Sequence, residues 1–228
     1  MMKVVVFGAS GGVGNHVVQQ ALEEGYAVRG VYRSTSTPRL EPNLEVAYVS
    51  DFFDRQALAE VIAGADAVIS CLGSCRKNPK NPWSKVTSPL DLMERFSRSL
   101  IEAMTALAMP KRLAIVSAAG VGTSAPLVHP VLRFIFDHST VGLEYKDLAR
   151  MEDQVERSNL DWTIVRPVTL TTGQLTNKVK ICSHYGLIDS ISRADVASFL
   201  LRCLEEPTSS TSRTPMICTK RFPKLEHF

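Results

Sequence analysis

The chain has 228 residues, of which 45% are hydrophobic and 21% are charged, and its formal net charge is +3. This balance is typical of a globular protein and excludes an intrinsically disordered chain. A positive excess this small argues against nucleic acid as a partner, and no apolar run is long enough to span a membrane. A strand-like segment and a glycine-rich loop follow Met1 almost at once, so we expect no signal peptide and a cytoplasmic protein.

Short apolar runs alternate with amphipathic stretches along the chain, which is the pattern of βαβ units around a parallel sheet. The predicted strands are 3–7, 27–32, 45–49, 66–71, 112–117 and 162–166, with weaker candidates at 178–182 and 215–219. The predicted helices are 12–24, 54–63, 89–108, 143–158 and 193–205. We therefore predict an α/β fold, namely a single Rossmann-like, doubly wound, mainly parallel sheet with helices on both faces.

Two of these helices carry capping signals at their starts. Ser88 is a plausible N-cap for the third helix, with Pro89 at its first position. Ser192 and Asp195 form a capping-box pattern at the start of the last helix. Both patterns predict where a helix begins.

The five cysteines are odd in number and lie mostly in apolar runs, unlike the disulfide framework of a small secreted protein. Cys71 and Cys75 are separated by three residues, but no second Cys or His pair at zinc spacing follows. The sequence therefore predicts five reduced thiols and no metal site.

Two segments, 73–88 and 118–142, fit neither the strand nor the helix pattern, and each follows a predicted strand. Both should leave the carboxyl edge of the sheet, where doubly wound folds bind their ligands. We interpret these segments as substrate loops, and residues 207–228 as a polar C-terminal tail.

The first of these loops is basic. Its charged side chains flank Trp83 and are Arg76, Lys77, Lys80 and Lys85. This combination can close over a planar, anionic substrate through charge and stacking. The alternative is an ordinary solvated basic loop, and the sequence leaves both open.

Residues 8–14 read Gly-Ala-Ser-Gly-Gly-Val-Gly and lie between a predicted strand and a predicted helix. In a dinucleotide-binding loop of this form, Gly8 permits the tight turn, Gly11 lets the backbone approach a pyrophosphate, and Gly14 lets helix and strand pack closely. The phosphates then lie at the positive end of the helix dipole. Strand, loop, helix and second strand follow in the required order, which favours a dinucleotide site over a glycine turn that only joins two elements.

The end of the second predicted strand indicates which dinucleotide binds. NAD sites carry a carboxylate there that holds the ribose 2′-hydroxyl, whereas this chain has Arg33, Ser34 and Thr35. A guanidinium pairs well with a phosphate, so we predict NADP(H), with a solvated arginine as the alternative. Asp51, at the end of the third strand, either contacts the adenine or forms an Asx turn or helix cap.

Beyond the glycine loop, the whole chain resembles the atypical short-chain dehydrogenase/reductase superfamily, in particular its NAD(P)H-binding NmrA-like proteins of the flavin reductase/biliverdin-IXβ reductase type. The segments that carry this resemblance are GASGGVG (8–14), YRS (32–34), SDFFD (50–54), VISCLG (68–73), IVSAAG (115–120), LDWTIVRP (160–167) and ISRADVASFLLRCLEEP (191–207). The resemblance implies that residues 1–228 form one NAD(P)-binding domain with the substrate over the nicotinamide. Redox members of the family reduce flavins, quinones, tetrapyrroles or other unsaturated acceptors.

The motifs and the resemblance together give the candidate cofactor contacts. They lie in the glycine loop and at the ends of the predicted strands, and they are Gly8, Ser10, Gly11, Gly12, Val13, Gly14, Arg33, Ser34, Asp51, Phe52, Leu72, Gly73, Ser117, Pro167 and Val168.

The larger superfamily uses a serine and a Tyr-x-x-x-Lys pair, in which the lysine lowers the pKa of the tyrosine. Ser117 and Tyr145 are the candidate catalytic residues, but Tyr145 is followed four residues later by Ala149, and the adjacent Lys146 would point about 100° away on a helix. Ser117 either orients the substrate or is a buried hydroxyl bonded to the backbone. Further candidate proton donors, each with a packing role as its alternative, are His129, His138 and Tyr185.

Hydride transfer to a flavin or quinone requires less of the protein, because the cofactor carries the reaction and solvent can supply the proton. We therefore predict an NADPH-dependent reductase of a flavin, quinone or similar conjugated acceptor, acting as a monomer or weak oligomer without a membrane partner. The alternative is a non-catalytic NADP(H)-binding regulator or assembly factor of NmrA-like type. An isomerase or epimerase fits less well, because no substrate domain follows residue 167.

Overall fold

The main sheet has the strand order of a doubly wound fold. The structure is a computed structural model that describes residues 1–33, 38, 41–107, 112–205 and 213–219. Within these residues the sheet runs β3 (Leu44–Tyr48), β2 (Ala27–Tyr32), β1 (Lys3–Phe7), β4 (Ala67–Ser70), β5 (Arg112–Val116), β6 (Asp161–Pro167), β10 (Met216–Cys218) and β8 (Lys180–Ile181). All neighbouring strands are parallel except β10 and β8. A second, two-stranded sheet pairs β7 (Thr169–Thr171) with β9 (Ser190–Ser192).

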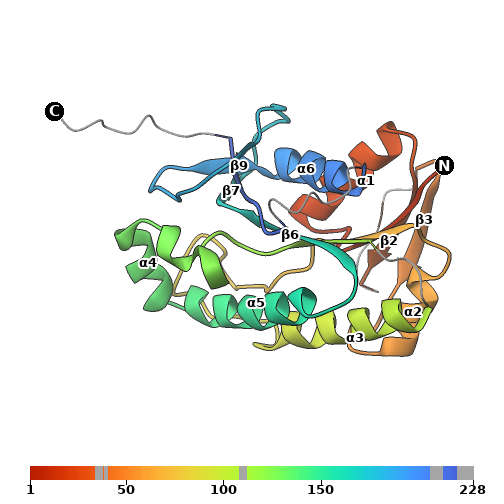
Figure 1. The fold of residues 1–228 in the computed structure, drawn as a ribbon, viewed down its shortest axis with the longest axis horizontal. Coiled ribbons are helices and arrows are strands. Elements are labelled where there is room, and N and C mark those ends of the chain that lie inside the picture. Colours follow the sequence, from red (N-terminus) through yellow and green to blue (C-terminus); the bar gives the residue numbers. More distant parts are fainter. Residues whose placement is uncertain (34–37, 39–40, 108–111, 206–212, 220–228) are drawn as a thin grey trace.

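Helices cover both faces of the main sheet (Figure 1). One face is covered by α1 (Gly12–Glu23) and α6 (Arg193–Glu205), and the other by α2 (Arg55–Ile62), α3 (Leu92–Leu107) and α5 (Val141–Glu156). Alternate residues of β1 divide between two cores: Val4 and Val6 pack on the α1/α6 side, whereas Val5 and Phe7 pack on the α2/α3 side. A central strand buried on both faces reads as a continuous apolar run, and this confirms the predicted fold class.

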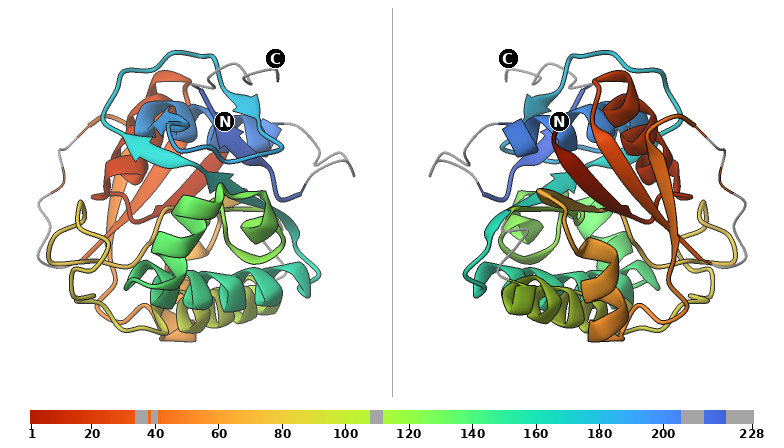
Figure 2. Two further views of the ribbon diagram at one scale, coloured as in Figure 1. Left: turned by 90° about the vertical axis from the view of Figure 1, so that its left-hand side faces the viewer. Right: turned by 90° about the vertical axis from the view of Figure 1, so that its right-hand side faces the viewer.

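Two short helices lie inside a segment predicted as a loop. Residues 118–142 contain a 3-10 helix (Gly122–Leu127) and α4 (Pro130–Asp137). His129 caps α4 by accepting a hydrogen bond from the Val131 amide. None of the residues of α4 is fully buried, but Leu132 and Phe136, four residues apart on one face, are half-buried and pack against the α1/α6 core. In the left view of Figure 2, α4 and the segment between β7 and β9 face the viewer on one side of the molecule.

The predicted start of the third helix is wrong. α3 begins at Leu92, and the Ser88 hydroxyl instead accepts a hydrogen bond from the Cys75 amide. The first amides of α3 are satisfied by another helix, because the carboxylate of Asp147 on α5 accepts from Met93 and Glu94. A cap supplied by a tertiary contact leaves no local sequence signal. At α6 the serine half of the predicted capping box is confirmed, because the Ser192 hydroxyl accepts from the Asp195 amide; the same hydroxyl donates to the Asp195 carboxylate.

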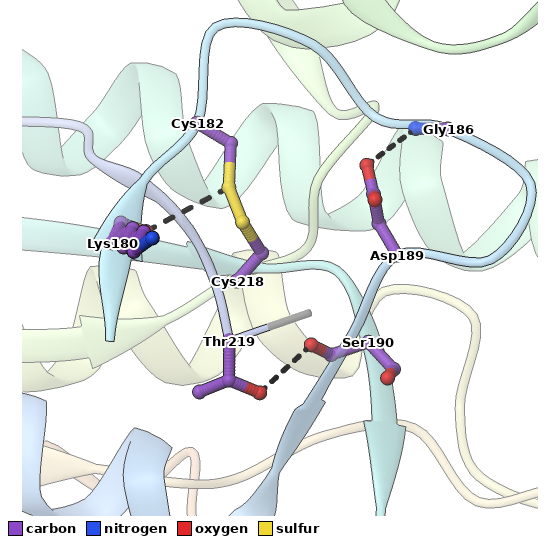
Figure 3. The surroundings of a disulfide bond; sticks show 7 residues. All are labelled: Lys180, Cys182, Gly186, Asp189, Ser190, Cys218 and Thr219. Carbon is purple, nitrogen blue, oxygen red and sulfur yellow. Dashed lines mark hydrogen bonds between the residues drawn. A yellow bond between two sulfur atoms is a disulfide. The ribbon is translucent and has the colours of Figure 1, made fainter. Parts of the chain in front are cut away.

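The prediction of five reduced cysteines is wrong for two of them. Cys182 and Cys218 form a disulfide, with 6.3 Å between their Cα atoms (Figure 3). Cys218 ends β10 and Cys182 directly follows β8, so the antiparallel pairing of these strands brings the two residues together. Cys71, Cys75 and Cys203 remain thiols. Part of the predicted tail 207–228 lies outside the described residues, but its residues 216–218 form β10.

No helix among the described residues is long and apolar enough to cross a membrane.

Candidate cofactor and substrate site

The glycine loop joins β1 to α1 at the centre of the sheet, where β1 lies between β2 and β4 and the order of the strands reverses. Gly8 has a φ of +74°, and a Cβ on it would lie 2.9 Å from the carbonyl of Cys71 in the loop after β4. A Cβ on Gly14 would overlap the carbonyl oxygen of Gly8. Gly8 and Gly14, two of the four glycines in this loop, are thus required because backbone atoms approach too closely for any side chain there.

The N-terminal end of α1 is open to an anion. Its N-cap, Gly11, has no side chain to accept from the first amides, and the first turn carries no acidic residue. The first amides of an α-helix have no partner within the helix. The positive end of α1 therefore lies at the carboxyl edge of β1 with donors available, next to the exposed Ser10 and Gly12.

The residues predicted to select the dinucleotide lie at the ends of β2 and β3. Arg33 directly follows β2 and is exposed, and Ser34 lies outside the described residues. Asp51 accepts a hydrogen bond from the Phe53 amide, so the Asx-turn alternative is present. Phe52 packs edge-on against core aromatic rings, which gives its side chain a structural contact.

Ser117 follows β5 with its hydroxyl unused. The residue is 7% exposed and its backbone amide donates to the carbonyl of Val165. Its Oγ is buried and has no hydrogen-bond partner in the described part of the chain, so the alternative of a hydroxyl bonded to the backbone is wrong. Buried polar atoms without a partner are uncommon and call for an explanation.

Pro167 and Val168 lie beside this serine at the end of β6. The Pro167 carbonyl accepts from the amide of Ala119, and the Val168 amide donates to Ile217 on β10. On the other side, Leu72 and Gly73 follow β4, with Leu72 packed on the α2/α3 core and Gly73 exposed. The candidate contacts thus line the carboxyl edge of strands that are neighbours in the sheet.

Tyr145 reaches the same edge from α5, but its hydroxyl is already engaged. It donates to the carbonyl oxygen of Ala119 at 3.0 Å, and its ring packs against Phe136. Burial raises the pKa of Tyr145, and the nearby Tyr185 and Glu144 raise it further. This shift is opposite to the one that a lysine produces in the usual tyrosine–lysine dyad.

Lys146 does not replace the missing lysine. Its side chain is exposed and lines a depression of about 230 Å³ together with Gly120, Phe136, Gly142 and Tyr145. Ala149 lies on the same depression. The structure therefore brings Ser117 and Tyr145 to one edge, where the nearby Arg76 lowers the pKa of Tyr145 by less than burial raises it.

The other candidate proton donors are bonded locally. The ring of His129 caps α4, as described above, and Nδ1 of His138 lies 2.8 Å from the carbonyl oxygen of Phe134. The Tyr185 hydroxyl lies 2.6 Å from that of Thr169. Each of these side chains therefore makes a local structural contact, which agrees with the packing role given above as the alternative to proton donation.

The basic loop 73–88 is fixed to the start of α5. Arg76 forms an ion pair with Glu144 at 3.2 Å, and the Trp83 indole donates to the carbonyl of His138. The Thr140 hydroxyl donates to Pro82 in the loop. Trp83 nevertheless remains 59% exposed. The loop is an ordered wall, and one of its four cations is already paired.

Sequence reasoning missed a buried ion pair under the second loop. Arg166 on β6 donates twice to the carboxylate of Glu152 on α5, at 2.7 and 2.9 Å, and once to the Thr123 hydroxyl. Both charged side chains are almost completely buried. Glycine at position 122 leaves room for the pair, because a Cβ there would lie 2.7 Å from a Glu152 oxygen. The sequence signal for this ion pair was Arg166 itself, a charged residue at the end of the apolar strand predicted at 162–166.

Comparison with known proteins agrees with this arrangement. The family model described as NAD(P)H-binding matches residues 8–207. An uncharacterized chloroplastic protein of Arabidopsis thaliana is 25% identical over 99% of this chain and 80% of its own.

Two solved structures share the fold. The anaerobilin reductase ChuY from Escherichia coli O157:H7 superposes with a TM-score of 0.74 and 21% identity, over 97% of this chain and 99% of its own. A short-chain dehydrogenase/reductase of Veillonella parvula in complex with NADP gives 0.74 and 17%, over 95% and 94%. These likenesses confirm the Rossmann-like α/β architecture.

Proposed function

Because the chain belongs to the NAD(P)H-binding family, we propose that it is an NADPH-dependent reductase that passes hydride to a flavin, quinone or similar conjugated acceptor. The observation that carries the proposal is the buried hydroxyl of Ser117 at the carboxyl edge of the sheet, which has no partner in the described part of the chain, together with Tyr145, whose hydroxyl is already bonded to Ala119. We further propose that residues 1–228 act as one NAD(P)-binding domain; the cytoplasmic location and the monomeric or weakly oligomeric state remain predictions.

The residues at the edge fit a dinucleotide. The backbone around Gly8 and Gly14 leaves no room for side chains, and Gly11 is the N-cap of α1. This loop at a helix N-terminus suits a pyrophosphate. Arg33 would pair with the 2′-phosphate. Ser117 would donate its hydroxyl to the nicotinamide or to the acceptor, which would satisfy an otherwise unpartnered buried group.

The chemistry follows from what Tyr145 can do. When bound, the reduced nicotinamide supplies the hydride. Tyr145 holds its proton, because burial raises its pKa and its hydroxyl donates to Ala119. A carbonyl substrate needs a proton donor in the transition state, whereas an electron-poor conjugated ring can take hydride first and a solvent proton afterwards. The site therefore favours a conjugated acceptor over a simple ketone, and ChuY, whose name describes reduction of anaerobilin, is a neighbour of this kind.

The test is to follow oxidation of NADPH with a panel of acceptors: FMN, FAD, a soluble quinone, a linear tetrapyrrole and a simple ketone. We expect turnover with at least one conjugated acceptor and none with the ketone. Ser117→Ala should lower that turnover, whereas Ser99→Ala, whose hydroxyl donates to Phe53 on the helix side, should not. Tyr145→Phe should lower it by less than about tenfold, since general acid catalysis contributes more than that.

The second candidate is a non-catalytic NADP(H)-binding regulator, favoured by the same engaged Tyr145 hydroxyl. Tight NADPH binding without oxidation by any acceptor would support this role and contradict the reductase. Absence of NADPH binding would contradict both.

A further inference from the structure

An arginine from α6 lies directly against the glycine loop. A Cβ on Gly12, the first residue of α1, would lie 2.6 Å from Cδ and 2.8 Å from Nε of Arg193. Its guanidinium carbon would be 3.8 Å from that position. Any side chain at position 12 would therefore displace Arg193. Arg193 lies in the segment 191–207 that carries the family resemblance, but the sequence pattern assigns no role to it.

The position of Arg193 is fixed from its backbone. It follows Ser192 at the start of α6. The Ser192 hydroxyl accepts a hydrogen bond from the Asp195 amide and donates one to the Asp195 carboxylate. The Asp195 carboxylate also accepts from the amide and hydroxyl of Thr176. The next carbonyl, that of Ala194, accepts from the side chain of Gln20 in the second half of α1. Since the backbone of Arg193 lies beside this part of α1, its half-buried side chain must extend back along the helix to reach Gly12.

The charges at this point favour an anion. A guanidinium beside a helix N-terminus is unfavourable by itself, because both are positive. Across residues 1–33, 38, 41–107, 112–205 and 213–219, no carboxylate forms an ion pair with Arg193 that would compensate, and the first turn of α1 has no acidic residue. An anion held between the helix amides and the guanidinium would make both contacts favourable.

We propose that Arg193 binds the pyrophosphate of the cofactor, and that position 12 is glycine because the arginine occupies the space of a side chain there. The inference rests on the cofactor binding proposed above. The end of α1 is where a dinucleotide-binding loop places the pyrophosphate, while Arg33, at the end of β2, is assigned to the 2′-phosphate. Arg193 therefore acts on the part that NADPH and NADH share.

The first experiment compares cofactor binding by Arg193→Met with Arg202→Met as its control. Arg202 lies on the same helix over the ring of Phe199, and the two variants have the same net charge. We expect Arg193→Met to weaken NADPH and NADH by the same factor, about tenfold to a hundredfold, as for loss of hydrogen bonds to a charged group. Binding of adenosine 2′-monophosphate, which has no pyrophosphate, should stay unchanged. Arg202→Met should bind all three probes like the wild type.

The second experiment tests the spatial argument with a double-mutant cycle. Gly12→Ala should weaken NADPH in the wild-type background by displacing Arg193, but should have no further effect in Arg193→Ala, where no long side chain is displaced. Unfolding midpoints of the cofactor-free variants identify any variant that fails to fold, and Arg193→Lys then replaces it.

The outcomes separate the two proposals. If the wild type binds NADPH and Arg193→Met binds it equally well, the role of Arg193 is wrong and the reductase proposal stands. A loss confined to NADPH would assign Arg193 to the 2′-phosphate and also overturn the inference. Equal effects of Gly12→Ala in both backgrounds would show that Arg193 does not explain the glycine. A wild type that binds neither dinucleotide would contradict the proposed function itself.

Discussion

Reduction of the Cys182–Cys218 disulfide should lower the stability of the protein substantially. The bond joins residues that are 36 positions apart, and both cysteines are buried, Cys218 almost completely. It connects the edge strand β8 to β10, and Tyr185, three residues after Cys182, in turn pairs its backbone with Leu127 and His129 of the second loop. The bond thus constrains both the sheet edge and the wall of the proposed acceptor site.

Loop-closure entropy gives the expected size. A closed loop of this length restricts the unfolded chain by about 4 kcal/mol at 25 °C in the chain-entropy model. For a chain of about 230 residues, 1 kcal/mol shifts the unfolding midpoint by about 2–4 °C, so reduction should lower it by about 8–16 °C.

The assay compares oxidised and reduced wild-type protein, which have the same sequence. Thiol titration after unfolding should find three thiols in the oxidised chain and five after reduction, since Cys71, Cys75 and Cys203 lie outside the bond. Cys182→Ala/Cys218→Ala should melt like the reduced protein and should not respond to reductant, whereas Cys75→Ala should keep the full response. Five thiols in protein kept under oxidising conditions, or equal midpoints with and without reductant, would refute the reasoning.

Three further predictions follow from the structure. Arg33→Ala should weaken NADPH far more than NADH in a binding titration, and equal losses would contradict the assignment of the 2′-phosphate. Glu152→Gln, which leaves the buried Arg166 without its carboxylate, should cost about 3–5 kcal/mol of unfolding free energy in denaturant titration, whereas exposed Glu156→Gln should cost little. Burial raises the pKa of Tyr26 to about 12, so the folded state keeps a proton that the unfolded state loses near pH 10. Stability should therefore fall between about pH 10 and 12, less steeply in Tyr26→Phe.

Much of the fold could be predicted because its signals are local. β1 is apolar from Val4 to Phe7 because these residues are buried on both faces of the sheet, and α1 ends at Glu23, shortly before Gly25. The elements that were missed are short. α4 has eight residues and buries none of them completely, although Leu132 and Phe136 give it one apolar face, and β7 and β9 have three residues each. The start of α3 is set by Asp147 on a different helix, which no reading of neighbouring residues reveals.

The same division holds for the candidate site. The glycine loop is contiguous in the sequence, so the spacing of Gly8 and Gly14 already predicts the close backbone approaches that the structure contains at these two positions. The contacts that were missed join distant parts of the chain: Arg166 with Glu152, and Arg193 with Gly12. In each case the arginine is visible in the sequence and its partner is not, because the pairing depends on how helices pack on the sheet.

The anchoring of loop 73–88 has a consequence for how an acceptor would enter. Its hydrogen bonds to the segment from His138 to Glu144 order this wall before any ligand arrives. Binding then loses little of its free energy to immobilising the loop, a cost that a mobile lid would add. An ordered loop of this kind selects the acceptor by shape and does not close around it. Acceptors should therefore be discriminated mainly by their width and planarity. The rate at which they bind should depend little on motion of the loop.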